Sequence, residues 1–120
     1  MRRKPGQLVP LEVSILEAAQ ALRGMGMAEA HGFLLARTIA DQRGAKHLTA
    51  YGSLYKALDR LERATLLESR WEDPREAAEA GRPRRRFYRM TAAGEGALAD
   101  ARDRAPTVAL DPLPDRSPVS

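Results

Sequence analysis

Five arginines lie within eight residues of this 120-residue sequence, in a stretch that contains no aspartate or glutamate: Arg82, Arg84, Arg85, Arg86 and Arg89. Guanidinium groups bind phosphate oxygens through directed hydrogen bonds, so such a run is suited to a polyanion. The formal net charge of +4 has the same sign. A solvated surface is the alternative, in which Arg86 and Arg89 face solvent or pair with Glu68 and Glu72.

A second basic group follows helical spacing. Ser53, Lys56, Arg60 and Arg63 recur at intervals of three, four and three, which places them on one face of a helix. A different face carries leucines at positions 54, 58 and 61. A hydroxyl near the start of a helix and cations further along are groups that contact base edges and phosphates in the major groove. The alternative is a solvent-facing helix whose cations pair with Asp59 and Glu62.

The elements that position these two groups can be predicted from periodicity and capping. The apolar spacing from Leu11 to Leu22 predicts a first helix of about three turns that ends at Gly24 and Gly26. A second helix is predicted over about 28–42 with Phe33 on its buried side. Thr49 is an N-cap candidate for the third helix. Strands are expected over 66–72 and 84–91, with a long polar loop at 74–83, and Thr91 can cap a last helix.

This order predicts a mainly α fold with a small β-hairpin, a winged helix-turn-helix (α-α-α-β-wing-β-α). Residues 1–7 are expected to form a flexible basic arm, residues 8–105 the domain with its C-terminal helix at about 91–105, and residues 106–120 a disordered proline-rich tail. Alanine accounts for 21 residues, so one modest core is expected. Trp71 is expected to pack in that core or in a dimer groove.

In a helix-turn-helix protein the second helix of the motif enters the major groove, and here that is the third helix. The residues predicted to contact double-stranded DNA are Thr49, Tyr51, Gly52, Ser53, Tyr55, Lys56 and Arg60 from this helix, with Arg82, Arg84 and Arg85 from the wing.

The sequence also resembles a known family. Residues 50–62 (AYGSLYKALDRLE), 66–69 (LLES), 81–94 (GRPRRRFYRMTAAG) and 31–36 (HGFLLA) are similar to motifs of the PadR-like transcriptional regulators. The resemblance implies a winged-helix repressor that dimerises, binds a palindromic operator and releases it in response to a small-molecule effector or another signal. Lys56 and Thr65 stand where that family usually has proline and glycine.

The last helix is a further departure, because the family commonly dimerises through an apolar C-terminal helix and here Leu98 is its only large aliphatic residue. We therefore expect Leu8, Leu11 and Ile15 to share the homodimer interface with Leu98.

Several function classes are not expected. Ser53 lacks the context of a nucleophile, and no glycine-rich phosphate loop is present, so the chain is not expected to be an enzyme. Two distant histidines without cysteine give no metal site, and no cofactor is expected. Without an apolar run long enough for a membrane, a cytoplasmic protein is expected.

The leading hypothesis is a homodimeric, sequence-specific transcriptional repressor. Two alternatives remain: a winged helix used as a protein-interaction module, and a nonspecific nucleic-acid-binding protein.

Overall fold

The computed structural model describes residues 7–43 and 51–104, which form a mostly helical fold with a small antiparallel sheet. The elements are α1 (Pro10–Gly24), β1 (Ala30–His31), α2 (Gly32–Arg43), α3 (Tyr51–Arg63), β2 (Leu67–Trp71), α4 (Pro74–Glu79), β3 (Arg86–Met90) and α5 (Ala92–Arg104). This order confirms the predicted winged-helix fold and adds two elements, β1 and α4. None of the described helices is long and apolar enough to cross a bilayer.

The sheet has three strands in the order β1-β3-β2, all antiparallel. β2 and β3 form the predicted hairpin, with Leu67 opposite Met90 and Trp71 opposite Arg86. β1 pairs Ala30 with Tyr88 and His31 with Phe87. The prediction of helix from residue 28 is therefore wrong at these positions. A strand of two residues is too short to show an alternation of apolar and polar side chains. Residues 30 and 31 form a strand because they pair with β3, which is distant in the sequence.

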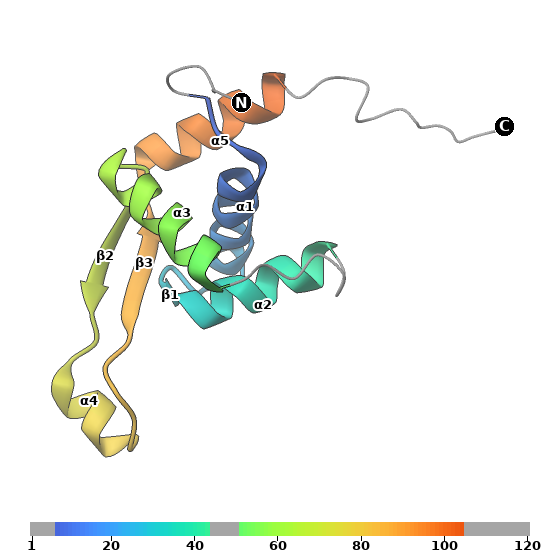
Figure 1. The fold of residues 1–120 in the computed structure, drawn as a ribbon. Coiled ribbons are helices and arrows are strands. Elements are labelled where there is room, and N and C mark those ends of the chain that lie inside the picture. The colour runs from blue at the N-terminus through green and yellow to red at the C-terminus, as the bar shows by residue number, and fades with distance from the viewer. Residues whose placement is uncertain (1–6, 44–50, 105–120) are drawn as a thin grey trace, which may run out of the picture.

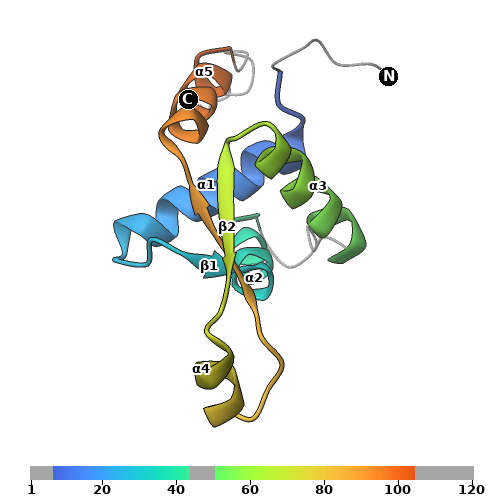
Figure 2. The same ribbon diagram turned by 90° about the vertical axis from the view of Figure 1, so that its left-hand side faces the viewer.

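The segment expected to be a long loop contains α4, so that prediction is wrong for Pro74–Glu79. Asp73 caps this helix by accepting the backbone N–H of Arg75 at 2.8 Å, and Pro74 occupies its first turn. Ala77 is 2 % exposed. Figures 1 and 2 both show α4 at the far end of the β2–β3 hairpin, on the opposite side of the molecule from α5.

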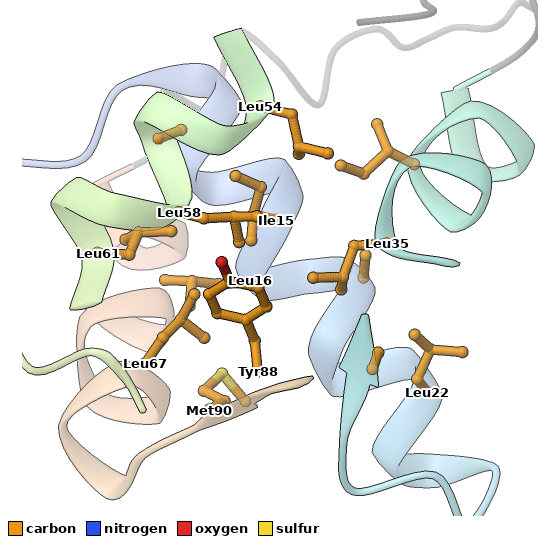
Figure 3. Close-up of a cluster of buried hydrophobic side chains, with 14 of the residues drawn as sticks. Ile15, Leu16, Leu22, Leu35, Leu54, Leu58, Leu61, Leu67, Tyr88 and Met90 are labelled. Carbon is orange, nitrogen blue, oxygen red and sulfur yellow. The ribbon is translucent and has the colours of Figure 1, made fainter. Parts of the chain in front are cut away.

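One hydrophobic core joins the helices to the inner face of the sheet, as Figure 3 shows. The leucines of α3 meet Ile15 and Leu16 of α1, and Tyr88 extends from β3 between them. Leu35 and Ile39 supply the buried side of α2. The fully buried side chains with the largest volumes are Ile15, Leu16, Leu35, Leu54, Leu58, Leu61, Leu67, Leu98 and Glu12.

The prediction that Phe33 is buried is wrong, since this side chain is 51 % exposed. Phe33 and Leu35 are two residues apart, which is about 200° around a helix, so both cannot face the core. Leu35 and Ile39 are four apart and share the buried face.

The ends of α1 and α5 follow the predicted signals. α1 ends at Gly24, and Gly26 has a φ of 91°, a backbone conformation that glycine adopts without strain. Thr91 caps α5, because its Oγ1 accepts the N–H of Gly94 at 3.0 Å.

The helix α3 ends in a different way. The N–H of Leu66 donates to the carbonyl of Leu61 at 2.9 Å, and the N–H of Thr65 donates to the carbonyl of Glu62 at 2.9 Å, which is the Schellman pattern. Thr65 holds the left-handed position with a φ of 63°. It is the only residue other than glycine with a positive φ in the part of the chain that the structure describes.

The last helix, α5, packs on α1 within the same chain. Arg23 forms an ion pair with Glu95, and Arg102 lies 3.8 Å from Glu17. Gly94 sits so close to the Leu66 carbonyl oxygen that a Cβ at this position would collide with it. The close approach explains a glycine in the first turn of the helix.

Candidate nucleic-acid interface

The helix α3 has the two separate faces that its spacing predicts. Leu54 and Leu58 are fully buried and Leu61 is 1 % exposed. Gly52, Ser53 and Lys56 are exposed on the other side. Lys56 has no ion-pair partner among the described residues, so its ammonium group is free to meet an anion.

Tyr55 connects the exposed side of α3 to the start of α2. Its side chain is 46 % exposed, and its ring lies so close to Gly32 that a Cβ there would be 2.7 Å from Tyr55 Cζ. Glycine at position 32 therefore allows α3 to approach the backbone of α2.

Arg60 is partly committed to the protein itself. Its Nε donates to Glu12 Oε2 at 2.8 Å, and Glu12 is 1 % exposed. The Glu12 carboxylate also accepts the N–H of Val9 at 3.1 Å. The Arg60 side chain remains 45 % exposed, so it anchors α3 to α1 while part of its surface faces solvent. At the end of the helix Arg63 pairs with Asp59 at 3.0 Å, as the alternative interpretation of this face expected.

The wing arginines are organised by one buried carboxylate, Glu72, which is 3 % exposed. Arg82 donates both terminal nitrogens to it, with Nη2 2.7 Å from Oε2. The backbone N–H of Arg85 lies 3.3 Å from Oε1, and Arg84 Nε donates to the Glu72 carbonyl at 3.0 Å. The hydrogen bonds from Arg82 lower the pKa of Glu72 to about 2, so it stays ionised at neutral pH. The charge run in the sequence did not indicate this clamp.

Trp71 lies on the surface of the wing and is 51 % exposed, so it does not pack in the core, and packing in a dimer groove stays a prediction. The guanidinium carbons of Arg84 and Arg86 lie 5.7 Å and 5.3 Å from the centroid of its ring. These are cation–π distances. The indole thus contacts two arginines on an exposed surface.

A hydrogen-bond network joins α3 to the hairpin. Ser69 of β2 donates to Glu62 of α3 at 2.6 Å, and Arg86 of β3 donates its Nε to Ser69 Oγ at 2.9 Å. Arg86 Nη2 lies 3.3 Å from Glu62 Oε2. Arg89 pairs with Glu68 at 2.7 Å, as expected across the hairpin. The network fixes the wing relative to α3.

A pocket of about 420 Å³ lies between α3, the start of α2 and the hairpin. Its lining includes Tyr55, His31 and Trp71 together with arginines 84 to 86. Burial is the main cause that lowers the pKa of His31, and the nearby charges of Arg85 and Arg82 lower it further. The pocket is therefore basic and aromatic.

The other predicted site residues divide into two groups. Thr49 lies outside the described residues, and so do residues 1–6 of the predicted N-terminal arm and the whole predicted tail at 106–120. Tyr51 is the first residue of α3. For the expected dimer interface, Ile15 and Leu98 are fully buried in the chain's own core. Leu8 and Leu11 are partly buried at its edge. Within residues 7–43 and 51–104, no group of three or more His, Cys, Asp or Glu side chains is placed to hold a metal ion.

Comparison with protein families matches residues 22–100 to the model described as "Transcriptional regulator PadR-like family". A comparison with curated proteins gives no significant match.

Three similar solved structures are named as transcriptional regulators. A regulator from Clostridium thermocellum has a TM-score of 0.61 at 18 % identity and aligns over 77 % of this chain and 78 % of its own. A PadR family regulator from Clostridium difficile R20291 has a TM-score of 0.60 at 19 % identity, over 78 % and 83 %. A PadR family regulator from Eggerthella lenta DSM 2243 has a TM-score of 0.52 at 21 % identity, over 77 % and 76 %. At these identities the similarity shows the shared fold.

Proposed function

Because this chain belongs to the PadR-like family of transcriptional regulators, we propose that it binds double-stranded DNA sequence-specifically and represses transcription as a homodimer. The observation that carries the proposal is the pair of neighbouring basic surfaces, the exposed face of α3 and the wing, joined through Glu62, Ser69 and Arg86. Two surfaces held in a fixed relation can contact a groove and the adjacent backbone of one duplex.

In this proposal the first turns of α3 read base edges. Tyr51, Gly52 and Ser53 begin the helix, and Tyr55 and Lys56 follow on its exposed side. Arg60 contacts the backbone with the part of its guanidinium that Glu12 leaves free. Arg84 and Arg85 of the wing contact phosphates, while Arg82 supports them through Glu72.

The regulator acts on an inverted repeat. In a two-fold dimer the two copies of α3 would enter major grooves about 34 Å apart, one turn of the duplex. Leu8 and Leu11 are the proposed interface residues that retain surface in the single chain. Sedimentation at micromolar concentration tests the dimer, and a monomer would remove this part of the proposal.

The regulator would work in the cytoplasm and release its operator in response to a small-molecule effector or another signal. It needs no cofactor and catalyses no reaction.

Selection of duplexes from fragments of the source genome, followed by binding in excess bulk DNA, tests the central proposal. A specific regulator keeps its selected site in the presence of competitor. Complete loss of the complex would indicate nonspecific binding, and no complex at all would favour a protein-interaction module.

Lys56→Ala identifies the binding helix. One good base contact contributes about 1–3 kcal/mol, so we expect operator affinity to fall roughly 5- to 150-fold with an unchanged circular dichroism spectrum. Arg63→Ala is the matched control, because it removes the same charge from the same helix at a position paired with Asp59. Equal effects of the two variants would contradict the role of α3.

A further inference from the structure

The pocket between α3 and the wing contains hydrogen-bond donors that lack an acceptor. His31 Nδ1 accepts the backbone N–H of Leu34 at 3.3 Å, at the start of α2. In a neutral imidazole with an accepting Nδ1, the proton is on Nε2. His31 Nε2 lies 3.2 Å from Arg85 Nη1, which is also only a donor. Two donors therefore face each other.

Arg85 has a second unmatched donor. Its Nε is buried and has no hydrogen-bond partner among the described residues. Unpartnered buried donors are uncommon because their desolvation is not compensated. Three N–H groups of two neighbouring residues thus lack a matching acceptor among the described residues.

The protein's own carboxylate nearby does not fill this role. Glu72 Oε2 lies 3.9 Å from Arg85 Nη2, and both carboxylate oxygens of Glu72 accept from Arg82. The pocket lining carries an excess of positive charge, because it includes Arg84, Arg85 and Arg86 but no carboxylate. Glu72 and Glu62, which pair with Arg85 and Arg86, lie outside the lining. An oxyanion with several acceptor oxygens is the chemical group that fits.

We propose that this pocket binds a phosphate group, held by His31 Nε2 and by the guanidinium group of Arg85. The inference rests on the proposed function for the source of the phosphate, which is one backbone phosphate of the duplex contacted by α3 and the wing. The position of the pocket favours a backbone phosphate, because Tyr55 of α3 and Arg84 of the wing, both proposed to contact the duplex, line the same pocket. A free phosphate-bearing molecule has the same chemistry, and the experiment separates the two.

The first arm uses inorganic phosphate and the histidine ring signals in proton NMR. The His31 signal, assigned by its absence in His31→Asn, is expected to shift saturably with phosphate at constant ionic strength. Asparagine also accepts the N–H that caps α2, so this variant keeps the helix start. Arg85→Lys keeps the charge and removes the Nε donor, and it should lose the saturable shift. Arg89→Lys is the control, since Arg89 pairs with Glu68 outside the pocket.

The second arm uses the selected duplex with single methylphosphonate substitutions, each of which removes one backbone charge. At one position in each half-site, the substitution should weaken wild-type binding about 10-fold or more, as expected for loss of charge-assisted hydrogen bonds. Arg85→Lys should bind the unmodified duplex about 10-fold more weakly and lose sensitivity at that position. His31→Asn should do the same, and Arg89→Lys should bind like the wild type.

The outcomes distinguish the inference from the proposed function. A saturable His31 shift with a matching methylphosphonate position supports a backbone-phosphate site. A saturable shift without such a position supports the pocket and identifies a free phosphate as its ligand. If chloride shifts His31 as much as phosphate, and Arg85→Lys responds to every methylphosphonate as the wild type does, the inference is overturned. Absence of DNA binding would overturn the proposed function, while the first arm still tests the pocket.

Discussion

Replacing Thr65 by glycine should stabilise the domain. Thr65 ends α3 with a φ of 63°, a region in which a side chain with a Cβ costs about 1–2 kcal/mol. Glycine adopts this conformation without that cost, but it loses about 0.4–1 kcal/mol through the greater freedom of the unfolded chain. The expected gain is therefore about 1 kcal/mol or slightly less. It corresponds to a rise of roughly 3–6 °C in Tm for a domain of this size.

The hydrogen bonds that hold residue 65 are made by its backbone, so the substitution should not reduce the expected gain in the free energy of unfolding. The Thr65 carbonyl accepts from Thr91 Oγ1 at 2.7 Å, and its N–H completes the end of α3, so glycine keeps both bonds. The side chain contributes an exposed bond to the Ala64 carbonyl at 2.5 Å. Solvent can replace this bond at little cost.

Thermal unfolding followed by circular dichroism measures the effect, with Thr38→Gly as the matched control. Thr38 lies inside α2, where glycine is unfavourable, and its Oγ1 bonds to the Leu34 carbonyl at 2.8 Å. We expect Thr38→Gly to lower Tm while Thr65→Gly raises it. A Tm for Thr65→Gly at or below that of the wild type, with the control behaving as expected, would refute the assignment of strain to residue 65.

Further variants address α5, the pH dependence and the wing. Gly96→Ala should raise stability by about 1 kcal/mol in thermal unfolding, since nothing lies within 4 Å of a Cβ there, whereas Gly94→Ala should lower it because of the Leu66 carbonyl. The pKa of His31 is lowered in the fold, so its contribution to stability is present above about pH 6.5 and is lost as the pH falls below that value. His31→Asn should therefore lose less Tm than the wild type between pH 7.5 and 5.5, and equal losses would contradict the shift. Arg84→Gln should reduce the slope of log affinity against log salt by about 0.9, the effect of one phosphate contact. An unchanged slope would place Arg84 off the DNA.

The elements that could be predicted from sequence are those with local signals. Leu54, Leu58 and Leu61 repeat with helical spacing, and this repeat defined both the buried and the exposed face of α3. Thr91 gave the start of α5. The hairpin is indicated by the change from helical to alternating spacing of apolar residues after Thr65. The helix α4 within it has a local signal too, the N-cap Asp73 followed by Pro74, but the polar composition of this segment favoured a loop.

The features that could not be predicted depend on contacts between distant residues. Trp71 shares the inner face of β2 with Leu67, which is 2 % exposed. At the end of β2, however, the same face is half exposed, since Trp71 is 51 % exposed and lines the pocket between α3 and the start of α2. The bond between Arg60 and Glu12 joins residues 48 positions apart, and no local spacing indicates it.

The five arginines between residues 82 and 89 form one cluster in the sequence, but their side chains make three different kinds of contact in the fold. Arg82, Arg86 and Arg89 each pair with a glutamate on the same domain. Arg84 lies over Trp71, and Arg85 has an unmatched donor beside the pocket. An ion pair that already neutralises a guanidinium releases fewer counterions when DNA approaches. Two phosphate contacts contribute about 1.8 to the salt slope, and five would contribute about 4.5. Among the described residues Arg84 forms no ion pair and Arg85 lies 3.9 Å from Glu72, so in the proposed complex the wing would hold the backbone weakly and leave discrimination between sites to α3.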